Sequence, residues 1–386
     1  KQPKLRSLFL LAFLLCCGLL QINAQEKTLQ KANNAFSKGE YYTAALFYEA
    51  LLKDTGKLVN KNFNPYNNKL LKQKQASLSE SVRKTVTVKA AESFYLHNNF
   101  TKAEVYYQEA IVKQLNTDVA VKLNYAKSLR ANNKLDLAES QLQSIVSDKL
   151  ATATQVQKAK AELANIQFYK EQQVQARVSI AKLPETAKLP NASYAPVAQG
   201  SRVFFTGTSF DSASFKKEQN PFRNVVYQLN TNTGIIDSVS ITNIEGVTHK
   251  AAISFTPDGN TAFFSGWSLS DSGIKKSAIY TIKKQGDSWG QPQLAAAVNL
   301  TGYSSQQPQV STDGKYLYFS SNMPGGNGGF DIWISALDGS SQPQTPANAG
   351  TTINTVDDEQ APFFHSKSNV LYFASNGRVG FGGFDL

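Results

Sequence analysis

Cysteine and histidine are almost absent from this chain of 386 residues, and their scarcity removes whole classes of function. The only two cysteines, Cys16 and Cys17, are adjacent, which excludes a disulfide framework and a cysteine-based zinc site. Histidine occurs at three positions, which argues against histidine-rich metal centres and acid–base chemistry. The signatures of serine hydrolases, zinc peptidases and P-loop proteins are also missing. We therefore predict no metal site, no cofactor and no catalytic residue.

Long hydrophobic runs are lacking too, with one exception near the N-terminus. Residues 8–20 are apolar, three basic residues precede them, and Ala24 stands before Gln25. This three-part pattern predicts a secretory signal peptide over residues 1–24. The run is shorter than the about 20 residues of a membrane-spanning helix, so an uncleaved anchor is the weaker alternative. Lipidation at Cys16 or Cys17 also stays open, although leucines rather than small residues precede them.

The charge balance divides the rest of the chain near residue 183. Residues 25–182 carry 24 basic and 14 acidic side chains, a balance of +10, and their pattern is helical. Residues 183–386 carry 13 basic and 15 acidic side chains, and they are rich in glycine, serine, asparagine and aromatic residues. Pro184 and Pro190 lie at the change, and proline ends helices. The basic residues are spread along helices without a nucleic-acid motif, so nucleic acid is not an expected partner.

The helical half contains three copies of one pattern. Each copy is a helix, a short polar turn and a second helix, with alanine where the paired helices approach closely. An insertion near residues 55–82 separates the first two copies, and residues 152–181 are predicted to form one further long helix that caps the array. An unrelated helical bundle is the alternative. The equivalent positions are Ala32, Gly39, Tyr41, Ala44, Tyr48 and Leu51; Ala91, Asn98, Phe100, Ala103, Tyr107 and Ala110; and Ala126, Asn133, Leu135, Ala138, Leu142 and Ile145.

The second half repeats with a spacing of 55 residues between Gly259 and Gly314. Residues 255–266 and 310–321 share a strand, an Asp-Gly turn and a second strand with paired bulky residues, and further copies begin near Tyr194 and Phe364. Asp-Gly supplies the positive φ that a tight hairpin turn requires. Four short strands at this period predict propeller blades.

Two polar features accompany the strand repeat. Gly-Gly-Phe-Asp occurs at residues 328–331 and 382–385, and we expect Asp331 and Asp385 to accept hydrogen bonds from backbone N–H groups of these loops. Metal binding by these aspartates is the alternative. The acidic cluster at residues 357–359 is predicted to be a solvated loop.

Both repeats resemble known families. The helical half is similar to the tetratricopeptide repeat, with asparagine in place of the usual turn glycine at two turns, where the left-handed backbone suits either residue. The strand half, with Leu-Tyr-Phe-Ser-Ser followed by Gly-Gly-Phe-Asp-Ile-Trp, is similar to the TolB-like, PD-type relative of the WD-repeat propeller. The predicted fold class is therefore multidomain, α then β: a tetratricopeptide α-solenoid over residues 25–182 and an incomplete TolB-like β-propeller over residues 183–386. Because closed propellers have about four to eight blades, we expect a C-terminally truncated fragment with about two further blades beyond Leu386.

The order of these parts resembles OmpA-family envelope proteins of Bacteroidetes, some of which serve type IX secretion and gliding. This resemblance implies an exported, non-enzymatic scaffold at the periplasmic face of the outer membrane. Its partners would be envelope or secretion-system proteins, with peptidoglycan bound only through a further, OmpA-like domain. In tetratricopeptide arrays the first helix of each repeat lines a peptide groove, and the positions here are Asn33, Glu92, Lys127 and Arg130. Lys127 and Arg130 share a helix face and suit an acidic peptide, with a plain solvated face as the alternative.

Two other functions remain open at this point. In the first, the chain is the N-terminal part of a propeller-gated serine peptidase whose hydrolase domain lies beyond Leu386. In the second, the propeller binds glycans through exposed aromatic residues among Trp267, Trp289 and Trp333. Trp267 and Trp333 lie at strand ends, which favours packing between blades.

Overall fold

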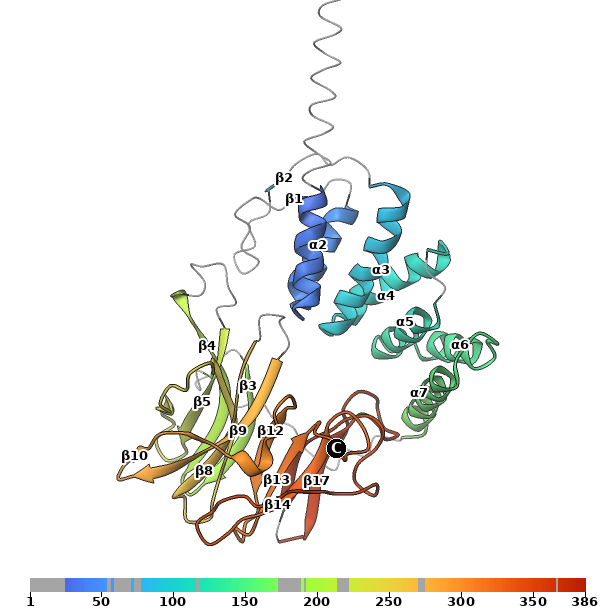
Figure 1. Ribbon diagram of the computed structural model, residues 1–386. Helices are drawn as coiled ribbons and strands as arrows, with labels where there is room; N and C mark the ends of the chain where they lie inside the picture. Colours follow the sequence, from blue (N-terminus) through green and yellow to red (C-terminus); the bar gives the residue numbers. More distant parts are fainter. Residues whose placement is uncertain are drawn as a thin grey trace, which may run out of the picture. The chain divides into compact units, whose positions relative to one another are not determined.

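The computed structural model divides into two compact units, Lys1–Gln172 and Gln173–Leu386, each of which is taken by itself below (Figure 1). It describes residues 25–53, 57–58, 71–72, 78–115, 118–172, 189–190, 192–213, 222–269, 275–365 and 367–386. The predicted signal peptide, both cysteines and the predicted boundary near residue 183 lie outside these ranges. None of the helices within them combines the length and apolarity that crossing a bilayer requires.

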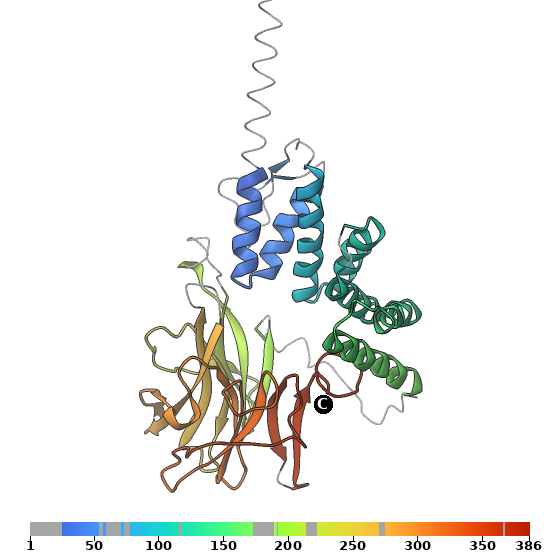
Figure 2. The ribbon, with the colours of Figure 1, turned by 45° about the vertical axis from the view of Figure 1, so that its right-hand side comes forward.

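The first unit is a succession of helical hairpins, in which each helix packs against the next one in the chain (Figure 2). Side chains at the N-caps explain several helix starts: Asn99, Asp118 and Thr152 each accept a hydrogen bond from a backbone N–H of the first turn. Two short strands, β1 (Lys57–Leu58) and β2 (Leu71–Lys72), pair within the predicted insertion. The helices are residues 25–37, α2 (Tyr41–Leu52), α3 (Glu80–Leu96), α4 (Phe100–Val112), α5 (Val119–Ala131), α6 (Leu135–Val146) and α7 (Ala153–Glu171).

The turn inside each hairpin has the left-handed residue that the sequence predicts. The φ angles are 73° at Gly39, 64° at Asn98 and 60° at Asn133. Glycine has no Cβ to clash in this region, and asparagine is among the few other residues that enter it readily. The substitution of asparagine for glycine therefore leaves the hairpin geometry unchanged.

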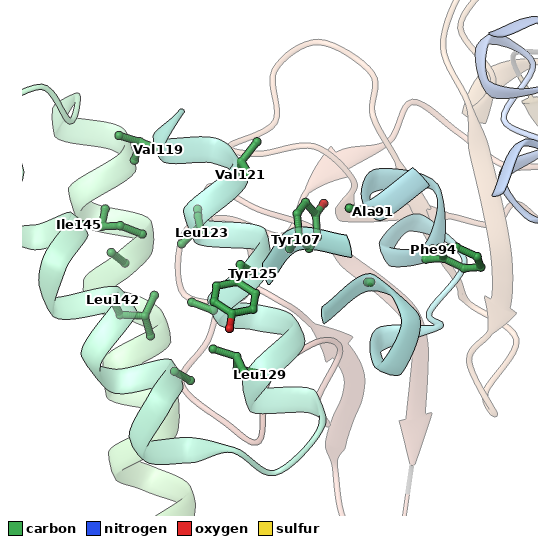
Figure 3. Packing of buried hydrophobic residues seen from close by; sticks show 14 of the residues in the cluster. Ala91, Phe94, Tyr107, Val119, Val121, Leu123, Tyr125, Leu129, Leu142 and Ile145 are labelled. Carbon is green, nitrogen blue, oxygen red and sulfur yellow. The ribbon is translucent and has the colours of Figure 1, made fainter. Parts of the chain in front are cut away.

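The repeated small and bulky positions form the core of the helical unit. The alanines at both fixed positions of all three copies are fully buried, and so are Tyr48, Tyr107 and Leu142 at the equivalent bulky position. Figure 3 shows Tyr107 and Leu142 packed among residues of neighbouring helices. A fully buried side chain of this size contributes about 1.5–3 kcal/mol, so this one position is a main source of stability in each hairpin.

The helix predicted over residues 152–181 is shorter than expected. It begins with a capping box between Thr152 and Gln155, and it ends at Glu171, because Gln172 has an extended backbone with ψ of 106°. The sequence prediction of residue 181 as its end was wrong because no glycine or proline marks a stop before Pro184.

The described residues of the second unit form four antiparallel sheets in chain order, and a short 3₁₀ turn, η1 (Ala296–Val298), leads from the second to the third. The first sheet is β3 (Ser193–Gln199), β4 (Arg202–Phe210), β5 (Phe222–Asn230) and β6 (Ile236–Ser238). The second is β7 (His249–Phe255), β8 (Thr261–Leu269) and β9 (Lys275–Gln285), with β10 (Ser288–Trp289) and β11 (Gln293–Leu294) both paired to β9. The third is β12 (Ser305–Val310), β13 (Tyr316–Ser321), β14 (Asp331–Ala336) and β15 (Ala347–Asn348), and the fourth is β16 (Glu359–His365) with β17 (Val370–Ser375).

The sheets are arranged in a propeller-like manner. The first strands β3, β7, β12 and β16 contact one another in that order, and the face of each sheet packs on the first strand of the next. Alternation along β8 places Phe264 in the core between the first and second sheets and Phe263 in the core between the second and third. Strand β8 therefore contributes a buried phenylalanine to the core on each face of the second sheet.

The Asp-Gly turns form as predicted, with φ of 69° at Gly259 and 72° at Gly314. Each aspartate also accepts hydrogen bonds within the turn. Thr256 Oγ1 donates to Asp258 Oδ1 at 2.6 Å, and Ser311 Oγ donates to Asp313 Oδ1 at 2.6 Å. Each carboxylate also accepts a hydrogen bond from the backbone N–H two residues later, of Asn260 or Lys315. Together these hydrogen bonds hold the pKa of both carboxyl groups below its ordinary value.

Every first strand carries a β-bulge that the sequence analysis did not predict. The bulged residues Ala195, Ala252, Gln307 and Ala361 have φ between 50° and 55°, and the strand register shifts across each of them. Left-handed backbone at alanine and glutamine is uncommon, so composition gives no sign of it. The only signal was the proline that follows three of the four residues.

Candidate interaction surfaces

The four residues predicted to line a peptide groove lie on the first helix of their hairpins. Asn33 Oδ1 accepts a hydrogen bond from Tyr48 Oη at 2.7 Å, and Glu92 forms a salt bridge with Lys89 at 2.9 Å. Lys127 and Arg130 do come together on one partner. Glu162 of α7 receives Lys127 Nζ at 3.3 Å and Arg130 Nε at 2.9 Å.

Glu162 changes what this part of the surface can bind. Its side chain is 11% exposed, so the two cations lie against a largely buried carboxylate. An acidic peptide would have to compete with this ion pair, and separating a partly buried pair leaves an uncompensated charge. The sequence analysis missed Glu162 because its spacing from Arg130 reflects packing between α5 and α7, not a local motif.

Ion pairs also join successive hairpins. Glu49 of α2 accepts hydrogen bonds from Lys102 Nζ at 3.0 Å and Tyr106 Oη at 3.2 Å, both on α4. Burial alone would raise the pKa of Glu49, but the hydrogen bonds from Lys102 and Lys53 lower it below its ordinary value. Lys89 Nζ lies 4.0 Å from the ring centroid of Phe36, which adds a cation–π contact between the first two hairpins. Several of the basic side chains of this unit therefore have an acidic or aromatic partner in a neighbouring hairpin.

Each sheet after the first is joined to the one before it by a side chain at an equivalent repeat position. We call these three side chains the junction acceptors: His249, Ser304 and Asp358. Asn224 N–H donates to His249 Nδ1 at 3.2 Å, and Ser277 N–H donates to Ser304 Oγ at 3.3 Å. Phe330 N–H donates to Asp358 Oδ1 at 2.7 Å. The three donors are successive residues 53 apart, at the start of the third strand of each sheet. Sequence alignment of the repeats could have found this position, although its residue type differs each time.

The bulges supply a second set of junction hydrogen bonds. Ala252 N–H donates to Thr206 Oγ1 of the first sheet at 2.9 Å, and Gln307 N–H donates to Ser265 Oγ of the second at 2.8 Å. At the third junction Ala361 N–H donates instead to the side chain of Gln307, at 2.9 Å. The left-handed bulge therefore turns a ladder N–H toward the neighbouring sheet.

The glycine-rich loops have the structural role predicted for them. Asp331 is buried and accepts hydrogen bonds from Asn327 N–H and Gly328 N–H, and Asp385 accepts one from Gly382 N–H at 2.9 Å. A Cβ at Gly328 would lie against the carbonyl oxygen of Asp357, so the close approach requires glycine. Across the described ranges no three His, Cys, Asp or Glu side chains are placed to hold a metal ion.

The acidic cluster at residues 357–359 is not the solvated loop that the sequence predicts. Glu359 is fully buried, and its carboxylate accepts hydrogen bonds from Thr355 and from Ser375 Oγ at 2.6 Å. Asp358 is the junction acceptor of the fourth sheet. A run of acidic residues resembles a solvated surface, and only the repeat position reveals that two of the three bind backbone and hydroxyl groups.

The tryptophans and His365 also fill structural positions. Trp333 is buried in the core between the second and third sheets and donates from Nε1 to Ser321 O at 3.2 Å. The ring centroids of Trp289 and Phe255 lie 5.9 Å apart, and Trp267 stacks on His249. His365, at the end of β16, binds Ser368 through Nδ1 within one hairpin turn. These contacts favour packing over glycan binding by the tryptophans.

Comparison with known proteins gives no family assignment. No family model matches the chain, and no curated protein matches it. Among solved structures, a TolB of Agrobacterium tumefaciens is similar at 13% identity over 48% of this chain and 59% of that one, with a TM-score of 0.29. A puromycin hydrolase matches at 11% identity, 41% and 23% coverage and a TM-score of 0.29. A Mycobacterium tuberculosis puromycin-hydrolysing peptidase matches at 16% identity, 40% and 21% coverage and a TM-score of 0.26.

The chain spans between 21% and 59% of the length of these three structures. At such TM-scores none of them adds to the argument. The account of the second unit therefore rests on its own sheets, junctions and repeats.

Proposed function

We propose that this protein is a non-enzymatic scaffold of a bacterial cell envelope that binds other proteins. In this proposal the helical unit is a tetratricopeptide solenoid, the stack of sheets belongs to a TolB-like propeller, and residues 1–24 direct export. The partners are envelope or type IX secretion proteins at the periplasmic face of the outer membrane. Contact with peptidoglycan would require a separate OmpA-like domain.

The repetition of junction contacts carries this proposal. In the helical unit the same left-handed turn and the same buried positions recur three times, and in the second unit the same acceptor position joins three successive pairs of sheets. Arrays of this kind expose an extended surface whose shape is set by the repeat, which suits them to binding proteins.

Site-specific photo-crosslinking in the producing cell tests the proposal. A photoreactive residue is placed at Asn33 or Glu92, on the predicted binding face, and at Leu137 as a control, which is exposed on the second helix of its hairpin. We expect discrete adducts with an envelope protein from positions 33 and 92 and none from position 137. Equal adducts from all three positions, or recovery of the protein in the cytoplasm, would contradict the proposal.

A chemical probe separates this proposal from the peptidase alternative. A phosphonate that reacts with active serine hydrolases is applied to the protein purified from its natural source. The scaffold proposal predicts no labelling. Labelling that is lost after heat denaturation would instead establish a serine hydrolase.

A further inference from the structure

His249 differs from the other two junction acceptors in one chemical respect. A backbone N–H can only donate, so the lone pair of His249 Nδ1 must accept the hydrogen bond from Asn224. A serine hydroxyl such as that of Ser304 does not titrate, and an aspartate titrates near pH 4, whereas an imidazole titrates near pH 6.5. Of the three acceptors, the imidazole is therefore the side-chain type whose reference pKa lies closest to neutral pH.

We propose that His249 forms a pH-sensitive hydrogen bond between the first and second sheets. With Nδ1 unprotonated, the ring accepts the hydrogen bond from Asn224 and holds the start of β5 to the start of β7. A proton on Nδ1 turns this acceptor into a second donor. The Asn224 N–H then loses its partner, and the junction loosens while the two following junctions stay closed. This inference does not depend on the identity of any binding partner.

The surroundings of the ring support a change of hydrogen bonding without loss of the ring's position. The imidazole stacks on Trp267, with centroids 5.1 Å apart and planes at 5°, and a protonated ring keeps a favourable contact with an indole face. Asn224 is held separately, because its side-chain amide donates to Tyr194 Oη at 2.9 Å. The ring can therefore stay in place while the hydrogen bond to the backbone is lost.

Charged side chains occur on the described strands around His249 and next to them. Lys250, the next residue of β7, donates from Nζ to Ile241 O at 2.9 Å, and burial lowers its pKa. Arg223, beside Asn224 on β5, pairs with Asp211 at 3.1 Å. The sequences of β3 and β8 contain no charged residue, whereas β4 carries Arg202 and β9 carries Lys275, Lys276, Lys283 and Lys284. The pH at which the hydrogen bond to His249 is lost is to be measured.

Amide hydrogen exchange in the full chain tests the proposal. Exchange of the Asn224 N–H is followed between about pH 7.5 and pH 5.5, corrected for intrinsic exchange, with the Ser277 and Phe330 N–H groups as internal references. We expect protection of Asn224 to fall about tenfold across this range, as for the loss of one hydrogen bond, while both references stay constant. Constant protection of Asn224 would overturn the proposal without any variant being made.

The repeat itself supplies the matched control. His249→Ser installs the acceptor that the third sheet uses, so the variant should keep the junction and lose the pH dependence at Asn224. His249→Asp provides the acceptor of the fourth sheet as a second variant. His365→Gln removes an unrelated imidazole and should leave the effect intact. The same pH dependence in His249→Ser as in the parent protein would show that another group is responsible.

Discussion

At the scale of single residues, the turn asparagines show how the conformation of one position can be predicted from the equivalent position in another copy of the repeat. Gly39 identifies the turn as left-handed, and Asn98 and Asn133 take the same conformation without glycine. The buried alanines and bulky residues were predictable for the same reason, because three copies reveal which positions recur. Glu162 was not predictable, since it appears once and acts through packing between helices.

Substitution at Asn133 tests the role of the left-handed turn. Asn133→Ala should lower the free energy of unfolding by about 1 kcal/mol, because a Cβ without a compensating polar group is unfavourable at positive φ. Asn133→Gly should leave the stability equal or higher. Urea denaturation of the full chain followed by circular dichroism measures both. An alanine variant as stable as the glycine variant would contradict this account.

At the scale of elements, the bulged first strand is the feature that sequence reasoning could least foresee. Strand, turn and strand followed from the Asp-Gly spacing. The bulge depends on where a ladder N–H finds its acceptor in the next sheet, which is a long-range property. The burial of Glu359 was missed for the same reason, because its partners come from the preceding connection and the neighbouring strand.

Glycine substitution should have opposite effects inside and outside the bulge. Ala361 lies at φ 52° and is exposed, so Ala361→Gly should raise the free energy of unfolding by about 0.5–1 kcal/mol by relieving an unfavourable backbone conformation. Ala336, exposed at the end of β14, is the control. Ala336→Gly should lower the stability by a similar amount. Two substitutions with the same sign would rule out backbone relief at the bulge.

The turns of the second and third sheets should contribute to acid sensitivity. The pKa values of Asp258 and Asp313 are lowered in the folded protein, so their stabilising effect is present above the unfolded-state pKa of about 4 and is lost as pH falls through the folded values. The double variant Asp258→Asn, Asp313→Asn should be less stable than the parent at pH 6, and this difference should shrink at pH 2.5. Urea midpoints at both pH values measure it. A difference that stays constant with pH would contradict the assignment to these carboxylates.

At the scale of the whole molecule, the fourth sheet presents apolar side chains on one face. Phe364 stacks on Tyr318 of the third sheet at 5.6 Å, so its strand neighbour Phe363 points to the opposite face, where it pairs with Tyr372. Phe363 and Tyr372 are 47% and 46% exposed. In the second sheet, Phe263 corresponds to Tyr372 and is covered by the third sheet. An exposed apolar sheet face of this kind promotes association.

Substitutions on this face should reduce self-association of this chain of 386 residues. We expect Phe363→Thr with Tyr372→Thr to lower the sedimentation-average mass at a given concentration while leaving the thermal midpoint within a few degrees, because exposed substitutions have small effects on stability. Phe364→Thr, on the packed face, is the control and should lower the thermal midpoint. Unchanged association in the double variant would show that another surface is responsible.

The fastening of each sheet to its predecessor has a mechanical consequence. A pulling force applied along the chain meets the junctions in series, and each is held by a small number of hydrogen bonds and by apolar contacts. Under load such a stack is expected to yield stepwise, one sheet after another, instead of failing all at once. The junction closed by His249 would be the step whose rupture force an acidic medium lowers.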